Sequence, residues 1–203
     1  MGHKERVAVF SIALCRSMSL PKDQIEVIAR GAFLHDVGKM AISVEILLKP
    51  GPLTSDETRT MREHCYIGYQ IVKKTASESP ANTMSMSALS PHLEEIAELV
   101  YTHHENFDGT GYPRGIKGDE IPIGARIIAV ANTLDSITTN LPYRPARSLS
   151  AAHAEIEKWS GRQFDPEVVK VFLQTPSRVW EDLRPRADSV KEDDAGSDQA
   201  PRR

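Results

Sequence analysis

Five of the seven histidines in this chain have neighbours that suit metal binding. These five are His3, His35, His64, His103 and His104. His35 directly precedes Asp36, while His103 and His104 are consecutive residues just ahead of a glycine-rich stretch. An imidazole nitrogen beside a carboxylate suits a divalent transition metal that also holds a water molecule. The residue types therefore favour a metal centre.

The spacing of these residues indicates what such a centre would do. Consecutive helical residues point about 100° apart, so a His-Asp or His-His doublet serves two metals, or one metal at a distorted helix end. Two metals close together would clamp a phosphate and generate hydroxide near neutral pH. Lys39, one turn beyond His35, could contact a phosphate oxygen as a point charge. Alternatively, Lys39 is an ordinary solvated lysine and a histidine on a helix has only a structural role. We prefer this structural role for His92 and His153.

Helices must position these residues, because the apolar spacing is helical nearly throughout and strand-like alternation is absent. The pattern predicts an all-α bundle. Two helices are expected around Val7–Leu14 and Ile25–Leu34, the second ending near Gly38. A third begins at the Thr54–Glu57 capping box and runs through Met61, Cys65 and Ile71. Others are expected at about 92–103, 123–138 and 149–159, and a last one has Asp165 as N-cap and Pro166 in its first turn.

Long loops should connect these helices. Residues 37–53 and 105–122 are expected to form two of them. A third, 76–91, is rich in Ser, Ala and Met with two prolines, and we expect Ser77 to Pro91 to be the least ordered internal segment. Residues 184–203 are polar and charged, which predicts a disordered tail after a single domain at 1–183.

Composition limits the classes of function. The 203 residues carry a formal net charge of -3, which argues against a globally basic nucleic-acid binder. The longest apolar run, Ile127–Ala131, is far shorter than the ~20 residues that cross a bilayer, and no signal-peptide pattern precedes it. The two cysteines form no disulfide framework, so a reducing cytoplasm is the expected location. Neither a membrane nor a nucleic-acid partner is expected, and the oligomeric state stays open.

Two ordered motifs resemble a known family. The segment Leu34-His35-Asp36-Val37-Gly38-Lys39 resembles the HD signature of metal-dependent phosphohydrolases. The run from His103 to Pro113 is similar to the HHExxDGxGYP signature of the HD-GYP subfamily. Shorter matches follow the same template at 47–51, 61–64, 121–122, 125–127 and 164–166. Over roughly His3 to Leu173, the chain is identified as a member of the HD-GYP domain family.

This resemblance implies a helical bundle that hydrolyses cyclic di-GMP with iron or manganese, two ions being most expected. The implied metal ligands are His3, His35, Asp36, His64, His103 and His104. Asp36 would bridge the metals, and Lys39 would lie near the substrate phosphate, which makes these two the implied catalytic residues. The loop Gly111-Tyr112-Pro113 would shape the substrate pocket and contact partners such as GGDEF-type signalling proteins.

The chain departs from the family pattern at three places. Asn132 stands where the family has a metal-binding aspartate, and its amide oxygen can coordinate but brings no charge. Leu141 replaces one phosphate-contacting arginine of the family, while Arg144 keeps the other basic position as a substrate-binding residue. The stretch from Ser77 to Pro91 is longer than in the family, and could act as a flap or be inert.

These departures leave three functions open. The first is a cyclic di-GMP phosphodiesterase, with activity reduced by Asn132 and Leu141. The second is a degenerate domain that acts as a nucleotide receptor or protein-interaction module. The third is an HD phosphohydrolase acting on another nucleotide. Metal content and turnover separate the first two, and a panel of nucleotide substrates tests the third.

Overall fold

The computed structural model describes residues 1–78, 92–140 and 145–183. Within these ranges all regular elements are helices, and the β-type contact found there is one isolated bridge between Ser160 and Phe164. The prediction of an all-α fold is confirmed. The helices are α1 (His3–Ser17), α2 (Lys22–Leu34), η1 (Val37–Ala41), α3 (Val44–Leu47), α4 (Ser55–Arg62), α5 (His64–Glu78), α7 (Leu93–Thr102), η3 (Gly118–Glu120), α8 (Ile123–Thr138), α9 (Leu149–Lys158), α10 (Pro166–Gln174) and α11 (Ser177–Leu183).

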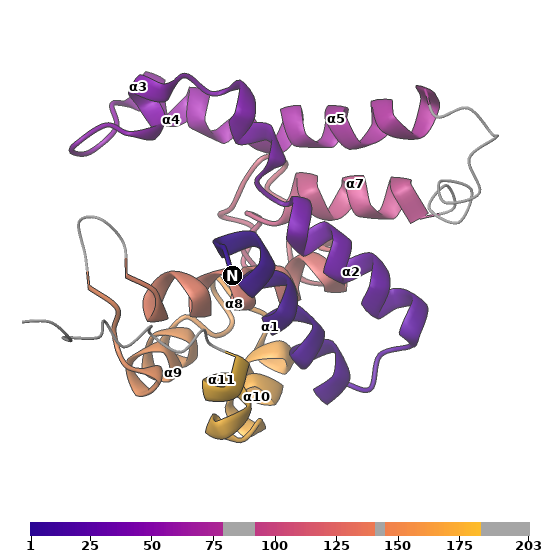
Figure 1. The fold of residues 1–203 in the computed structure, drawn as a ribbon, viewed down its shortest axis with the longest axis vertical. Helices are drawn as coiled ribbons and strands as arrows, with labels where there is room; N and C mark the ends of the chain where they lie inside the picture. Colours follow the sequence, from indigo (N-terminus) through magenta and orange to yellow (C-terminus); the bar gives the residue numbers. More distant parts are fainter. Residues whose placement is uncertain (79–91, 141–144, 184–203) are drawn as a thin grey trace, which may run out of the picture.

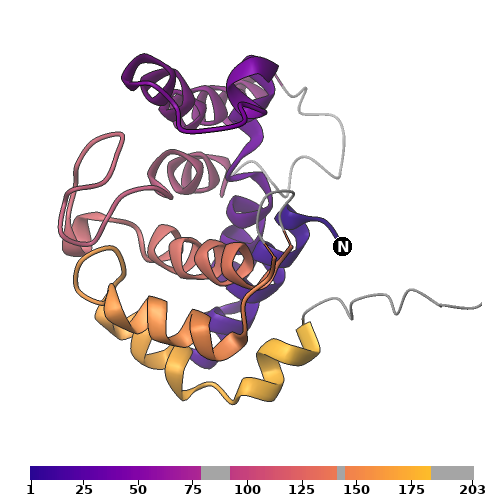
Figure 2. The ribbon, with the colours of Figure 1, turned by 90° about the vertical axis from the view of Figure 1, so that its left-hand side faces the viewer.

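The helices pack around α1 and α8. Figure 1 shows α5 lying along α7 at one end of the molecule, α1 and α2 in the middle, and α9 to α11 at the other end. Seen from the side in Figure 2, α9 and α10 cover one side of α8. The core is apolar and closed, because Phe10, Leu14, Leu134 and Trp180 are all 0% exposed.

This packing brings four helix ends together. His3 begins α1, His35 caps the end of α2, His64 begins α5, and His103 caps the end of α7. At a helix end, several main-chain N–H or C=O groups have no hydrogen-bond partner within the helix and can bond to side chains. The four histidines can therefore point into a common space while their helices pack elsewhere.

Two predicted caps are confirmed. Thr54 and Glu57 form the capping box at the start of α4. Asp165 caps α10 by accepting a hydrogen bond from the Glu167 main-chain N–H, with Pro166 in the first turn. The predicted ranges 92–103, 123–138 and 149–159 correspond to α7, α8 and α9.

The single helix expected from Thr54 through Ile71 is wrong, because the chain breaks at Glu63 into α4 and α5. Beside the break there is a tertiary contact that periodicity does not reveal. Here η1 packs so closely against the start of α5 that a Cβ on Gly38 would lie 2.0 Å from the main-chain oxygen of His64 and 2.6 Å from the nitrogen of Gly68. The break places His64 at the start of a helix.

Other boundaries also differ from expectation. The expected loop at 37–53 contains η1 and α3, and the one at 105–122 contains η3. Helix α5 continues to Glu78, so residues 76–78, which were expected to belong to a loop, are helical, and 79–91 lie outside the described residues. Helix α11 was not expected; it forms because it buries Trp180 against Phe10 and Phe172. The tail expected at 184–203 also lies outside the described residues.

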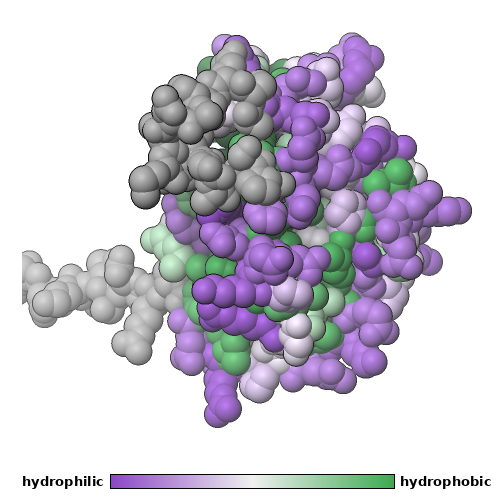
Figure 3. Space-filling model, turned by 90° about the vertical axis from the view of Figure 1, so that its right-hand side faces the viewer, coloured by the Kyte–Doolittle hydropathy of each residue, from purple (hydrophilic) through white to green (hydrophobic). Residues whose placement is uncertain are grey.

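The face in Figure 3 is mostly hydrophilic, with hydrophobic residues in smaller areas between hydrophilic ones. Among the described helices, none combines the length and apolar character needed to cross a membrane.

Candidate metal centre

Asp36 lies at the middle of the histidine cluster. Its Oδ2 is 3.3 Å from His35 Nε2 and 3.8 Å from His3 Nε2. Its Oδ1 faces the other way, 3.5 Å from His64 Nε2 and 4.0 Å from His103 Nε2. The two carboxylate oxygens therefore face two separate groups of imidazoles, as a carboxylate that bridges two metal ions would.

Three of the imidazoles are oriented in the same way by the main chain. Each uses Nδ1 to donate to the carbonyl oxygen three residues earlier, at or near the end of a helix. The pairs are His35 with Ala32 (2.7 Å), His64 with Met61 (2.7 Å) and His103 with Val100 (2.8 Å). A hydrogen bond at one ring nitrogen fixes the tautomer and leaves the other as a lone-pair donor. In all three rings, Nε2 is the nitrogen left for a metal.

The free nitrogens need a cation between them. His64 Nε2 and His103 Nε2 lie 3.4 Å apart. Both are acceptors when their Nδ1 atoms carry the protons, so they cannot hydrogen-bond to each other. His35 Nε2 and Asp36 Oδ1 are buried with no hydrogen-bond partner, which is costly unless a ligand satisfies them. This donor set fits a divalent metal.

The ionisation states also suit metal binding. Burial raises the pKa of Asp36, but its close contact with His35 and the positive charge of Lys39 outweigh that effect and hold the pKa well below its usual range. Desolvation lowers the pKa of His64 and of His103, and lowers that of His104 to about 3. Asp36 is therefore a carboxylate, and His64, His103 and His104 are neutral imidazoles, the forms that bind metals.

His3 joins the cluster from α1 through side chains. Its Nδ1 donates to Asp135 Oδ2 at 2.7 Å, and Asp135 also accepts two hydrogen bonds from Arg6, at 2.5 and 3.0 Å. The Asp135 side chain is only 2% exposed, whereas that of His3 is 40% exposed. His3 is thus brought to Asp36 as expected, by an Arg6–Asp135 ion pair that the sequence did not indicate.

His104 completes the other side of the cluster. One ligand atom from each of His64, Cys65, His103 and His104 lies within 4.8 Å of the others. Cys65 is a buried core residue, but its sulfur is also 3.5 Å from His64 Nε2. Burial raises the pKa of the Cys65 thiol to about 12, so the thiol is protonated at neutral pH. Cys65 therefore borders the site as a neutral group.

Two more predicted site residues, Lys39 and Asn132, lie beside this cluster. Lys39 Nζ donates to Asp36 Oδ2 at 2.7 Å, which places its charge at the centre. Asn132 shares a cavity of about 100 Å³ with His103 and His104. Arg144 and Leu141 lie outside the described residues.

The Gly111–Pro113 loop lies against His104. The Tyr112 ring stacks on the His104 ring with centroids 4.8 Å apart. Gly111 is required at its position, since a Cβ there would lie 2.2 Å from the main-chain nitrogen of Asn106. The buried Glu105 carboxylate closes the loop by accepting from the main-chain N–H groups of Arg114 and Gly115. The loop is therefore held in place by the residues that follow the histidine pair.

The fold and this cluster define a helical domain built around a histidine–aspartate centre. A family model described as HD domain matches residues 1–168. The chain belongs to the HD domain family, and its second motif puts it in the HD-GYP branch, so the resemblance found in the sequence is confirmed.

Curated relatives of the chain carry phosphodiesterase names. It is 38% identical over 186 residues to the cyclic di-GMP phosphodiesterase of Thermotoga maritima, covering 92% of this chain and 47% of the relative. It is 36% identical to the response regulator RpfG of Xanthomonas campestris, a cyclic di-GMP phosphodiesterase, over 84% of this chain and 42% of the relative. A 3′3′-cGAMP-specific phosphodiesterase of Vibrio cholerae is 37% identical, with 82% and 33% covered. The chain thus spans about half or less of these relatives.

Two solved structures share the fold. A cyclic GMP-AMP specific phosphodiesterase of Vibrio cholerae gives a TM-score of 0.65 at 19% identity, over 90% of this chain and 46% of that one. A HDGYP protein from Bdellovibrio bacteriovorus gives 0.62 at 17% identity, over 83% and 49%. At these identities the likeness supports the fold alone.

Proposed function

We propose that the chain binds two divalent metal ions and hydrolyses a phosphodiester bond of cyclic di-GMP. The observation that carries the proposal is the position of Asp36, whose two oxygens face different groups of imidazoles. The names of the curated relatives support cyclic dinucleotides as the substrate class. The ligands we propose for one ion are His3, His35 and Asp36, and those for the other are Asp36, His64, His103 and His104.

The protein's own groups would have distinct roles. When bound, the ions supply Lewis acidity toward a phosphate oxygen and a hydroxide near neutral pH. Lys39 is 39% exposed beside Asp36, so its ammonium group can bind a phosphate oxygen and hold the substrate at the centre. The main-chain bonds of His35, His64 and His103 keep the ring nitrogens oriented with no reorganisation during the reaction.

Three further predictions from the sequence belong to this proposal. An imidazole-rich site with one carboxylate suits iron or manganese as the metal. Tyr112 and its loop remain the proposed contact for GGDEF-type signalling partners. Cys15 and Cys65 are both buried and free, which suits the reducing cytoplasm predicted from the sequence.

The test is metal analysis combined with turnover on cyclic di-GMP, in wild type and in His103→Ala. The proposal expects bound metal and linear product from wild type, and loss of both from the variant. Metal-loaded wild-type protein that cleaves no cyclic dinucleotide would contradict it. Thermal unfolding of His103→Ala checks that the variant still folds.

A second candidate function is a nucleotide receptor without turnover. Asn132 favours it, because this neutral side chain shares a cavity with His103 and His104 where the family has a charged ligand. In that case the chain would bind cyclic di-GMP in an equilibrium assay but leave it intact. Parallel assays with 3′3′-cGAMP and other nucleotides distinguish such a receptor from an enzyme that acts on another substrate.

A further inference from the structure

A cavity of about 390 Å³ adjoins the histidine cluster on the side of the Gly111–Pro113 loop. It lies between the end of α4, that loop and the turn from α9 to α10. His104 forms part of its wall, so a molecule bound there would also contact the proposed metal centre. Its volume falls in the range of about 300–1,000 Å³ that is usual for small-molecule sites.

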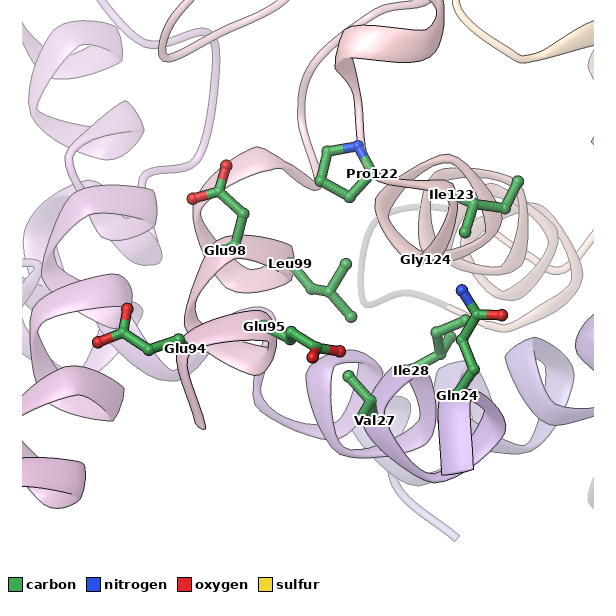
Figure 4. A pocket seen from close by; sticks show the side chains of 10 residues that line it. All are labelled: Gln24, Val27, Ile28, Glu94, Glu95, Glu98, Leu99, Pro122, Ile123 and Gly124. Carbon is green, nitrogen blue, oxygen red and sulfur yellow. The ribbon is translucent and has the colours of Figure 1, made fainter. Parts of the chain in front are cut away.

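Another cavity of the protein has a different character. It occupies about 340 Å³ between α2, α7 and the start of α8, and Figure 4 shows its apolar side chains with three glutamates around them. Glu94, Glu95 and Glu98 would repel a phosphate, and no predicted site residue lines this cavity. A nucleotide therefore suits the cavity beside His104 and not this one.

The cavity beside His104 carries positive charge. The guanidinium of Arg62 lies over the Tyr112 ring, 4.7 Å from its centroid, and the same ring stacks on His104. Arg162 lines the cavity from the turn between α9 and α10. Within the described part of the chain, neither arginine forms an ion pair with a carboxylate. Both guanidinium groups are therefore available to an anionic or hydrogen-bonding ligand.

Asp108 adds an oriented acceptor close to Arg162. The Asp108 main-chain N–H donates to the Arg162 carbonyl at 2.9 Å. Its Oδ1 accepts from the Thr110 main-chain N–H and hydroxyl at 2.9 and 2.6 Å. These bonds fix the carboxylate and lower its pKa, so it is charged at neutral pH. Because both bonds use Oδ1, Oδ2 can accept from a ligand.

This combination matches the edges of guanine. Arginine donates well to guanine O6 and N7, and a carboxylate can accept from guanine N1–H and its 2-amino group. Adenine presents an amino donor in place of O6, which would oppose the guanidinium. The partly buried Trp159 lines the same cavity and offers an aromatic ring of the kind on which bases stack.

We propose that this cavity is a guanine subsite, in which Arg162 and Asp108 recognise the base and Arg62 binds an adjoining phosphate. The inference rests on the proposed phosphodiesterase function and names the part of the substrate that this cavity takes. It predicts that cyclic dinucleotides with guanine bind better than cyclic di-AMP.

The test compares equilibrium binding and KM for cyclic di-GMP and cyclic di-AMP in four variants of the chain. Arg162→Gln and Asp108→Asn should weaken binding of cyclic di-GMP about tenfold or more and reduce its preference over cyclic di-AMP. Arg62→Gln should weaken both ligands alike. The matched control is Arg178→Gln, an exposed arginine on α11 that should behave as wild type. Metal content should be unchanged in all four.

The outcomes separate the two proposals. If wild type binds and cleaves cyclic di-GMP while the Arg162 and Asp108 variants match the Arg178→Gln control, the guanine subsite is wrong and the proposed function stands. If wild type neither binds nor cleaves any cyclic dinucleotide, both are wrong. Asparagine at 108 keeps an Oδ1 acceptor for Thr110, so the loop should stay folded, which thermal unfolding can check.

Discussion

The histidines of the cluster are held in place in two different ways. His35, His64 and His103 have side chains that are 0–1% exposed, and each is oriented by a main-chain carbonyl. His3 is 40% exposed and is oriented by the Asp135 side chain. A ring tied to the main chain keeps its orientation as long as its helix is folded. A ring tied to another side chain depends on an ion pair that one substitution can remove.

Because of this difference, we expect the two sides of the proposed metal centre to bind their ions with different affinity. The side formed by His64, His103 and His104 should bind its ion whenever the helices are packed. The His3 side should bind its ion more weakly, because His3 is more exposed and relies on Asp135 and Arg6. Substitutions on the two sides should therefore have unequal effects.

The largest effect is expected from Asp36→Asn, because Asp36 contacts both sides. The variant loses the charge that faces four imidazoles, and we expect turnover of cyclic di-GMP to fall by more than about a hundredfold. The comparison with Asp56→Asn, an exposed residue of α4, controls for loss of one negative charge. Turnover within a few fold of wild type would contradict a bridging role.

Asn132→Asp should have a smaller effect of opposite sign. A carboxylate in the cavity shared with His103 and His104 adds a charge beside the proposed ion. We expect metal retention during dialysis against a chelator to improve about tenfold, with turnover rising in parallel. Equal retention and turnover in the two proteins would show that Asn132 is not the weak point of the centre.

Asp135→Asn tests the His3 side by itself. Loss of a residue that orients a ligand typically costs about 10- to 100-fold in metal affinity. We expect that loss for one of the two ions, while the other stays bound. Asp23→Asn, at the start of α2 and away from the cluster, is the matched control. Loss of both ions together would contradict the division between the two sides.

The smallest effect concerns His153, a histidine outside the cluster that packs against Phe172. Desolvation lowers its pKa from the usual value of 6.5, so below about pH 6.5 the unfolded chain binds a proton that the folded chain does not. Stability should therefore fall as the pH drops, and His153→Leu should reduce that fall. We expect a difference of a few degrees in Tm at pH 5.5 and none at pH 7.5. An identical fall in both proteins would contradict the structural interpretation of His153.

The sequence predicted the features of the fold that depend on a periodic apolar pattern or on residues adjacent in the chain. The helix at 123–138 follows from its apolar spacing, and the caps at Thr54 and Asp165 follow from adjacent residues. The close packing of Gly38 against α5, next to the break at Glu63, could not be predicted, because it joins two different elements.

The site shows the same limit. The doublets His35–Asp36 and His103–His104 are visible in the sequence because their members are neighbours. Asp135 pairs with His3 across 132 residues, and no local pattern indicates such a contact. Cys65 has the spacing of a core residue, and it is one, so only the fold reveals that it also touches His64.

The most direct test of the central claim is the number of metal ions per chain. Protein loaded with iron or manganese and freed of excess metal should be measured for wild type, Asp135→Asn and Asp36→Asn by elemental analysis. The account predicts up to about two ions in wild type, about one in Asp135→Asn, and the least in Asp36→Asn. The same metal content in all three proteins, or none in wild type, would contradict it.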